Sequence, residues 1–178
     1  MKTIASYIIF GTMALTVASC SDGWLDVEPS TAVETDKSIN ELSDVNIMLN
    51  GIYTTMQDAY AYSGRLVYYG DACGDDMMAY SSTKRTGNYY TFNFTKDTAP
   101  STFWSYPYKM IGLCNIILAK IDNLETKETE LRDYYKGQAL ALRAMLLFDL
   151  TKFYGYPYKK DNGASLAVPI VTTVLDKE

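Results

Sequence analysis

The stretch GQALALRAMLLFDLTKFYGYPY, residues 137–158, predicts most of a long helix and the turn that ends it. The helix is expected over residues 128–154, because a set of residues there recurs at three- and four-residue steps, which places them on one side of a helix. That side contains Leu131, Tyr135, Gln138, Leu142, Met145, Asp149 and Phe153. Gly155 follows at once, and glycine is the residue that most often ends a helix.

A second helix is predicted beside this one. Gly137, Ala141 and Ala144 are small, so a neighbouring helix can approach that side closely. Residues 101–123 have helical spacing and are predicted to form this neighbouring helix. Pro107 either bends it or marks its first turn. Antiparallel pairs of this kind form tetratricopeptide-like units, so the predicted fold is mostly α.

A third helix is expected to open at Ser38, which has the capping-box spacing with Glu41. Its apolar residues recur at helical spacing over about five turns. They are Leu42, Val45, Leu49, Ile52, Tyr53, Met56 and Tyr60. Ser63 and Gly64 are predicted to end this helix.

Residues 68–102 lack helical spacing and predict a loop-rich insert. The alternation of Tyr90, Phe92 and Phe94 with polar residues favours one or two short strands there. Flat rings beside amide and guanidinium donors suit the faces and hydroxyls of sugars. The candidate ligand-binding residues are therefore Tyr80, Arg85, Asn88, Tyr89 and Tyr90. Three nearby aspartates do not have the spacing of a calcium loop, so no metal site is predicted.

The first residues have the pattern of a bacterial export signal. Lys2 precedes a short apolar run, and small residues stand directly before Cys20. The run is shorter than the roughly 20 residues of a membrane-crossing helix. Residues 1–19 are therefore predicted to be removed, Cys20 to be acylated, and residues 20–36 to form a tether.

Composition excludes several classes of function. The chain has 16 basic and 21 acidic residues, so clustered phosphate-binding cations are not expected and nucleic acid is not a predicted partner. Histidine is absent, which excludes Ser/His/Asp and Cys/His catalysis. Cys73 and Cys114 are either buried thiols or one disulfide. Asn115 and Arg143, within apolar helices, are interpreted as paired structural groups.

Residues 137–158 resemble the central signature of the SusD/RagB family, in which a G-E-A-x-x-L-R-A helix precedes an aromatic turn. The segments WLDVEPS, DACGDDM, MIGLCNIILAKI and LAVPIVTT lie where the family has similar ones. Gln138 replaces the usual glutamate. The resemblance implies a tetratricopeptide-like scaffold, no cofactor, and an outer-membrane lipoprotein that passes oligosaccharide or another nutrient to a TonB-dependent, SusC-like barrel transporter.

The resemblance also implies a longer protein. Residues 37–178 are expected to correspond to the N-terminal helical domain of a family member, without the C-terminal part. Two other functions stay open. The chain could belong to a surface glycoside hydrolase, although no pair of catalytic carboxylates can be recognised in the sequence. It could also be a helical protein-interaction module that binds no small ligand.

Overall fold

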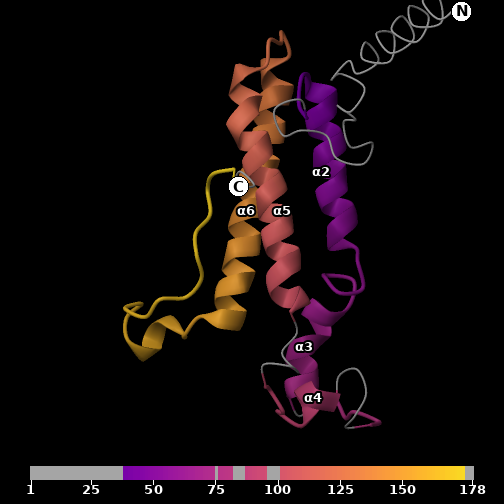
Figure 1. Ribbon diagram of the computed structural model, residues 1–178, viewed down its shortest axis with the longest axis vertical. Coiled ribbons are helices and arrows are strands. Elements are labelled where there is room, and N and C mark those ends of the chain that lie inside the picture. The colour runs from indigo at the N-terminus through magenta and orange to yellow at the C-terminus, as the bar shows by residue number, and fades with distance from the viewer. Residues whose placement is uncertain (1–37, 75, 82–86, 96–100, 175–178) are drawn as a thin grey trace, which may run out of the picture. The chain divides into compact units, whose positions relative to one another are not determined.

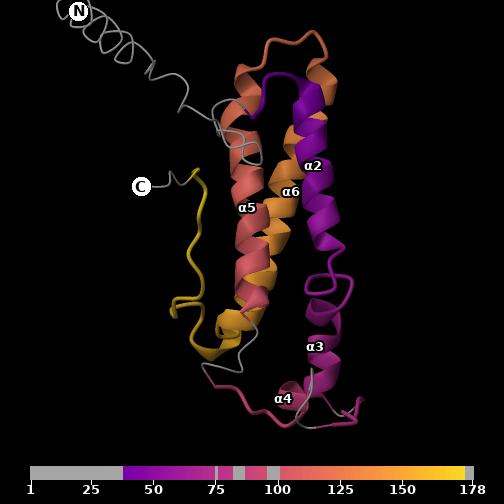
Figure 2. The same ribbon diagram turned by 45° about the vertical axis from the view of Figure 1, so that its right-hand side comes forward.

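Three long helices organise the chain in the computed structural model, which describes residues 38–74, 76–81, 87–95 and 101–174. Apart from Ser38, these residues belong to one compact unit, Ile39–Glu178. The helices are α2 (Leu42–Met56), α5 (Thr102–Lys120) and α6 (Thr129–Tyr154). Figures 1 and 2 show them side by side, with α5 running opposite to the other two.

The antiparallel pair α5–α6 confirms the two helices predicted over residues 101–123 and 128–154. The 3₁₀ helix η4 (Ile121–Asn123) follows α5, and the chain turns at residues 124–128 into α6. An ion pair of 2.6 Å between Lys136 Nζ and Asp122 Oδ2 joins both sides of this turn. Pro107 lies inside α5 and is buried, so it does not mark the first turn of the helix.

Helix α2 confirms the third prediction, but its bounds differ. Its N-cap is Glu41 instead of Ser38, because the carboxylate of Asp44 accepts the backbone N–H groups of Asn40 and Glu41 at 2.8 and 3.1 Å. The helix ends at Met56, before the stop predicted at Ser63 and Gly64, since the Asp58 carboxylate accepts the N–H of Tyr60 at 2.7 Å and forms a turn.

The core lies between the three long helices. It contains Ile39, Val45, Leu49, Ile52, Met110, Ile111, Cys114, Ile117, Ile121, Ala139, Leu142, Leu146 and Leu150. At these positions nearly all of the apolar surface is removed from water, which is the main stabilising contribution to a helical bundle. The pattern predicted for α2 is confirmed at its four buried residues.

The buried residues of α6 coincide with the predicted side only at Leu142. Ala139, Leu142, Leu146 and Leu150 are buried, whereas Leu131 and Met145 are 36% and 37% exposed. The small residues Gly137, Ala141 and Ala144 are also exposed, so they do not face α2 or α5. Apolar side chains occur around most of this helix, and spacing alone therefore did not distinguish the side that α2 and α5 cover.

The loop-rich insert contains two short helices, α3 (Arg65–Cys73) and α4 (Gly87–Tyr90). The predicted strand is wrong: Tyr90 closes α4, Phe92 has a left-handed φ of 53°, and no strand occurs among the described residues. Of the three alternating rings, Phe94 contacts Tyr69 with centroids 6.3 Å apart, but Tyr90, Phe92 and Phe94 are all more than a third exposed and so do not form the buried face of a strand.

After α6 the chain turns back along the bundle. The 3₁₀ helix η5 (Tyr158–Lys160) is followed by an extended segment, residues 161–174. Its backbone is tied to α5 by the Tyr108 hydroxyl, which donates to the carbonyl of Pro169 at 2.8 Å. Cys73 and Cys114 are both free thiols. Within the described ranges, no helix has the length and apolar character that crossing a membrane requires.

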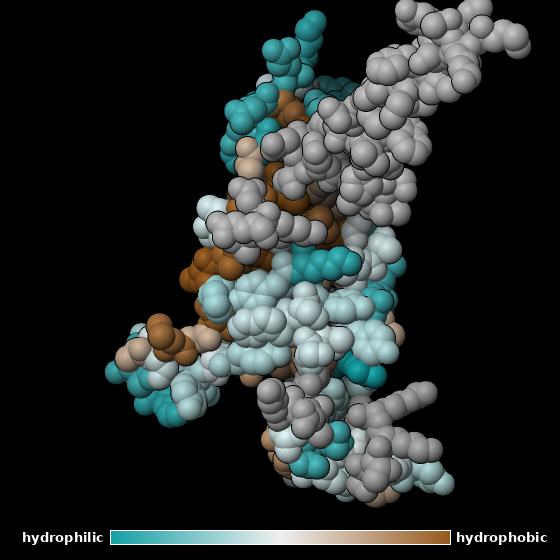
Figure 3. All heavy atoms as spheres, in the orientation of Figure 1, coloured by the Kyte–Doolittle hydropathy of each residue, from teal (hydrophilic) through white to brown (hydrophobic). Residues whose placement is uncertain are grey.

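Polarity is unevenly distributed over the surface. Figure 3 shows hydrophilic groups at the end of the bundle formed by the α5–α6 turn, and hydrophobic groups over the middle of the helices. Large apolar or aromatic side chains are also exposed along the second half of α6 and beyond it. They include Met145, Phe148, Tyr154, Tyr156, Tyr158, Leu166 and Ile170.

Candidate functional site

Helix α4, which contains three of the candidate residues of the insert, lies beside α3 at one end of the bundle (Figure 1). Tyr80 is fully exposed, with a relative accessibility of 105%. Asn88, Tyr89 and Tyr90 form most of helix α4. Arg85, like the predicted lipidation site Cys20, lies outside the described residues. The structure therefore brings three of the five candidates together on one short helix.

Tyr89 packs inward and supports that helix. It is 5% exposed, and its ring lies 5.1 Å from Tyr69 in an edge-on contact. Tyr69 in turn makes edge-on contacts with Phe103 of α5 and Phe153 of α6 at 5.1 and 5.3 Å. Burial raises the pKa of the Tyr89 hydroxyl above its ordinary value. The ring of Tyr89 thus connects the insert to the bundle.

Tyr90 and Tyr80 present rings to solvent. Tyr90 is 39% exposed at the end of α4, and Asn88 lies two residues before it. The helix is held by a backbone bond from Asn93 N–H to the carbonyl of Asn88 at 2.9 Å. Aromatic rings on a supported helix, beside amide donors, are suited to stack on a sugar and to hydrogen-bond its hydroxyls.

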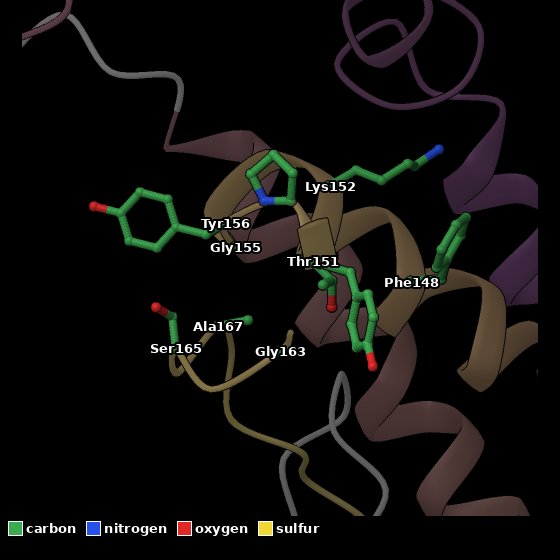
Figure 4. A pocket seen from close by; sticks show the side chains of 10 residues that line it. Phe148, Thr151, Lys152, Gly155, Tyr156, Gly163, Ser165 and Ala167 are labelled. Atoms are coloured by element: carbon green, nitrogen blue, oxygen red, sulfur yellow. The ribbon is translucent and has the colours of Figure 1, made fainter. Parts of the chain in front are cut away.

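A second aromatic surface was missed by sequence reasoning. It is a pocket of about 500 Å³ at the C-terminal end of α6, and we call it the α6-end pocket. Its lining residues are Phe148, Thr151, Lys152, Gly155, Tyr156, Pro157, Tyr158, Gly163, Ser165 and Ala167. Figure 4 shows α6 on one side and the returning segment with Gly163, Ser165 and Ala167 on the other.

Two glycines allow the walls of this pocket to approach each other. A Cβ on Gly155 would lie 2.7 Å from the carbonyl oxygen of Thr151 and 2.9 Å from the Cβ of Ala167. Gly163 has a left-handed φ of 79°, and a Cβ there would lie 2.9 Å from the ring of Tyr158. The signal that could have revealed this pocket is the density of tyrosines around Gly155, directly after a helix end.

The Asp161 carboxylate holds the loop that closes the pocket. Its Oδ1 accepts the backbone N–H groups of Gly163 and Ala164, each at 3.1 Å, and its Oδ2 accepts the Ser165 hydroxyl. These bonds, first of all that from Ser165, lower the pKa of Asp161. Because an ionised aspartate only accepts hydrogen bonds, it is well suited to gather several donors in one turn.

Two pairs of polar side chains inside the bundle are hydrogen-bonded to each other. The Tyr62 hydroxyl donates to Asp149 Oδ2 at 2.6 Å, and burial together with this bond raises the pKa of Tyr62. Arg143 donates to the side-chain oxygen of Asn115 at 3.0 Å, so its partner is an amide instead of the expected carboxylate or backbone carbonyl. The interpretation of Asn115 and Arg143 as structural groups agrees with these contacts.

The fold and these two surfaces define a helical scaffold that presents aromatic rings. Residues 23–177 match a family model described as "Starch-binding associating with outer membrane", the SusD-like proteins. Since this match covers most of the sequence, the chain belongs to the SusD-like family. The resemblance inferred from residues 137–158 is confirmed.

Individual relatives agree with this assignment. A crystal structure of a candidate sugar-binding protein from Bacteroides vulgatus is 63% identical, with a TM-score of 0.74 over 79% of this chain and 32% of that one. A SusD superfamily protein from Bacteroides thetaiotaomicron is 34% identical, with a TM-score of 0.70 over 76% of this chain and 31% of that one.

The relatives are longer than this chain. A SusD-like protein of Formosa agariphila is 24% identical over 145 residues, which are 80% of this chain and 28% of the relative. The chain thus spans roughly a third of the length of the proteins it matches.

Proposed function

We propose that this chain is part of an outer-membrane lipoprotein that binds oligosaccharide and passes it to a TonB-dependent, SusC-like transporter. The observation that carries the proposal is the match of residues 23–177 to a family described as starch-binding at the outer membrane. The 63% identity to a candidate sugar-binding protein supports the same class of ligand. Binding without chemical change is the activity proposed.

The exposed rings of the insert are the proposed contacts with the glycan. Tyr80 and Tyr90 offer flat faces, and Asn88 and Arg85 supply donors within the same insert. A pyranose ring has apolar C–H faces and polar hydroxyl edges, so an aromatic ring with nearby donors recognises both. Tyr89 contributes indirectly, because its contact with Tyr69 holds α4 in place.

Anchoring completes the proposal. Cys20 would carry the acyl chains, residues 1–19 would be removed, and residues 20–36 would serve as a tether to the helical domain. Several acyl chains on one residue bind a membrane stably, whereas a single chain binds only marginally. A tethered receptor stays near its transporter while its binding loops reach into the medium.

Affinity electrophoresis in gels containing soluble starch tests the proposed contacts. Retardation of the full chain is expected, and Tyr80→Ala and Tyr90→Ala should each reduce it. Tyr134→Ala is the matched control, because Tyr134 is 64% exposed on α6, outside the insert. If all variants are retarded equally, the insert does not belong to the binding site. If starch does not slow the unsubstituted chain, glycan binding is contradicted.

A further inference from the structure

We propose that the α6-end pocket is a second glycan-binding site, one that takes one or two glucose units of an α-glucan through Tyr158, Phe148 and Tyr156. The inference rests on the proposed function, because the ligand class comes from the family's starch-binding description. It adds a site that is separate from the insert in the sequence. The end of α6 and the segment that returns along the bundle form this site (Figure 4).

The size and lining of the pocket fit a short saccharide. Its volume of about 500 Å³ lies within the range of roughly 300–1,000 Å³ typical of small-molecule sites. Phe148, Tyr156 and Tyr158 are 64%, 60% and 72% exposed, although aromatic rings are usually buried. Three exposed rings around one hollow thus provide apolar faces that a pyranose can cover.

The rings are held in position before any ligand arrives. Gly163 lets the Tyr158 ring pack against its backbone, since a side chain there would come within 2.9 Å of that ring. The ammonium group of Lys160 lies 3.1 Å from the centroid of Tyr156, and that of Lys152 lies 5.1 Å from the centroid of Phe148. A cation therefore lies near each of these two rings, and both side chains are still more than half exposed.

The charge of the lysine that lines the pocket from α6 is compensated, which suits a neutral ligand. Lys152 forms an ion pair of 2.6 Å with Asp149, so its charge is largely compensated while its remaining N–H donors can reach solvent. The hydroxyls of Tyr156 and Tyr158 add groups that both donate and accept. Donors and acceptors beside exposed rings, with the nearest lysine of α6 paired, match the hydroxyl-rich and uncharged surface of a glucan.

Calorimetric titration of the full chain with maltoheptaose tests the inference. Tyr158→Ala and Tyr156→Ala should each weaken binding about 3- to 10-fold, the loss expected for one stacked ring. Tyr158→Phe keeps the ring and should bind within about twofold of the unsubstituted chain. Tyr134→Ala again serves as the control, and thermal unfolding followed by circular dichroism verifies that each variant is folded.

The outcomes separate this inference from the proposed function. If Tyr80→Ala and Tyr90→Ala weaken binding while both alanine variants of the pocket bind like the unsubstituted chain, the second site is overturned and glycan binding stands. If the unsubstituted chain does not bind maltoheptaose, both fall. If Tyr158→Ala fails to fold, calorimetric titration of Gly163→Val decides, because the added side chain displaces the Tyr158 ring. Binding of maltoheptaose should then weaken about 3- to 10-fold, and binding equal to that of the unsubstituted chain would overturn the site.

Discussion

Arg143 on α6 donates to the side-chain oxygen of Asn115 on α5 at 3.0 Å, and this contact sets the direction of the Asn115 amide. With its oxygen occupied, the amide NH₂ group points to the returning segment and donates to the carbonyls of Val171 and Thr173 at 3.0 and 3.1 Å. Asn115 is 2% exposed. One buried amide therefore joins two helices and the extended segment.

Asn115→Ala should destabilise the fold by about 1–3 kcal/mol, because it leaves a half-buried guanidinium N–H and two carbonyls without this partner. Urea denaturation measures the free energy of unfolding. The control is Asn46→Ala, at an exposed position of α2, which should change that free energy by less than about 0.5 kcal/mol. Equal effects of the two substitutions would show that the Asn115 contacts do not stabilise the protein.

Gly155→Ala should also destabilise the protein, by about 1–3 kcal/mol, since the added Cβ would lie 2.7 Å from a backbone oxygen. Gly137→Ala makes the same chemical change within α6, where a Cβ meets nothing within 4 Å. That substitution should stabilise the helix by about 0.5–1 kcal/mol. Thermal unfolding of the two variants should move in opposite directions, and a shift in the same direction would be inconsistent with the packing at Gly155.

Stability should fall with pH above 9 because of Cys114. Burial raises the pKa of this thiol from 9.0 to about 11. The thiol ionises at a lower pH in the unfolded chain than in the folded protein. The contribution of the buried, protonated thiol to stability is therefore complete below pH 9 and is lost as the pH rises to 11. Urea titrations at pH 9 and 10 should show a smaller loss of unfolding free energy in Cys114→Ala than in the unsubstituted chain, and an equal loss in both would contradict this role of Cys114.

Cys20→Ala should release the protein from membranes when the full chain is produced in a bacterium that acylates lipoproteins. Labelled palmitate should be incorporated into the unsubstituted chain and into Cys73→Ala, but not into Cys20→Ala. Label retained by Cys20→Ala would contradict the proposed anchor.

The long helices could be predicted from the sequence because their signals are local. Apolar spacing and the stop at Gly155 placed α6 within one residue of its bounds, and apolar spacing placed the start of α5 within one residue and its end within three, where η4 follows. The side of α6 that is buried could not be predicted, since Leu140 and Phe148 are as apolar as Leu146 but face outward. That choice depends on where α2 and α5 pack, which is a property of the whole bundle.

The binding surfaces were harder to predict than the helices. Tyr89 and Tyr90 are adjacent and chemically identical, yet one is 5% and the other 39% exposed. The difference comes from the ring of Tyr69, on a helix some twenty residues earlier, which only folding brings to Tyr89. The α6-end pocket similarly requires residues 148–167 to fold back on themselves around Asp161.

Glycan binding without cleavage is the central claim, and calorimetric titration of the full chain with maltoheptaose tests it most directly when the sugar is afterwards recovered and analysed by chromatography. The account predicts saturable heat of binding and maltoheptaose returned at its original length. An absence of binding, or the appearance of shorter oligosaccharides, would contradict it.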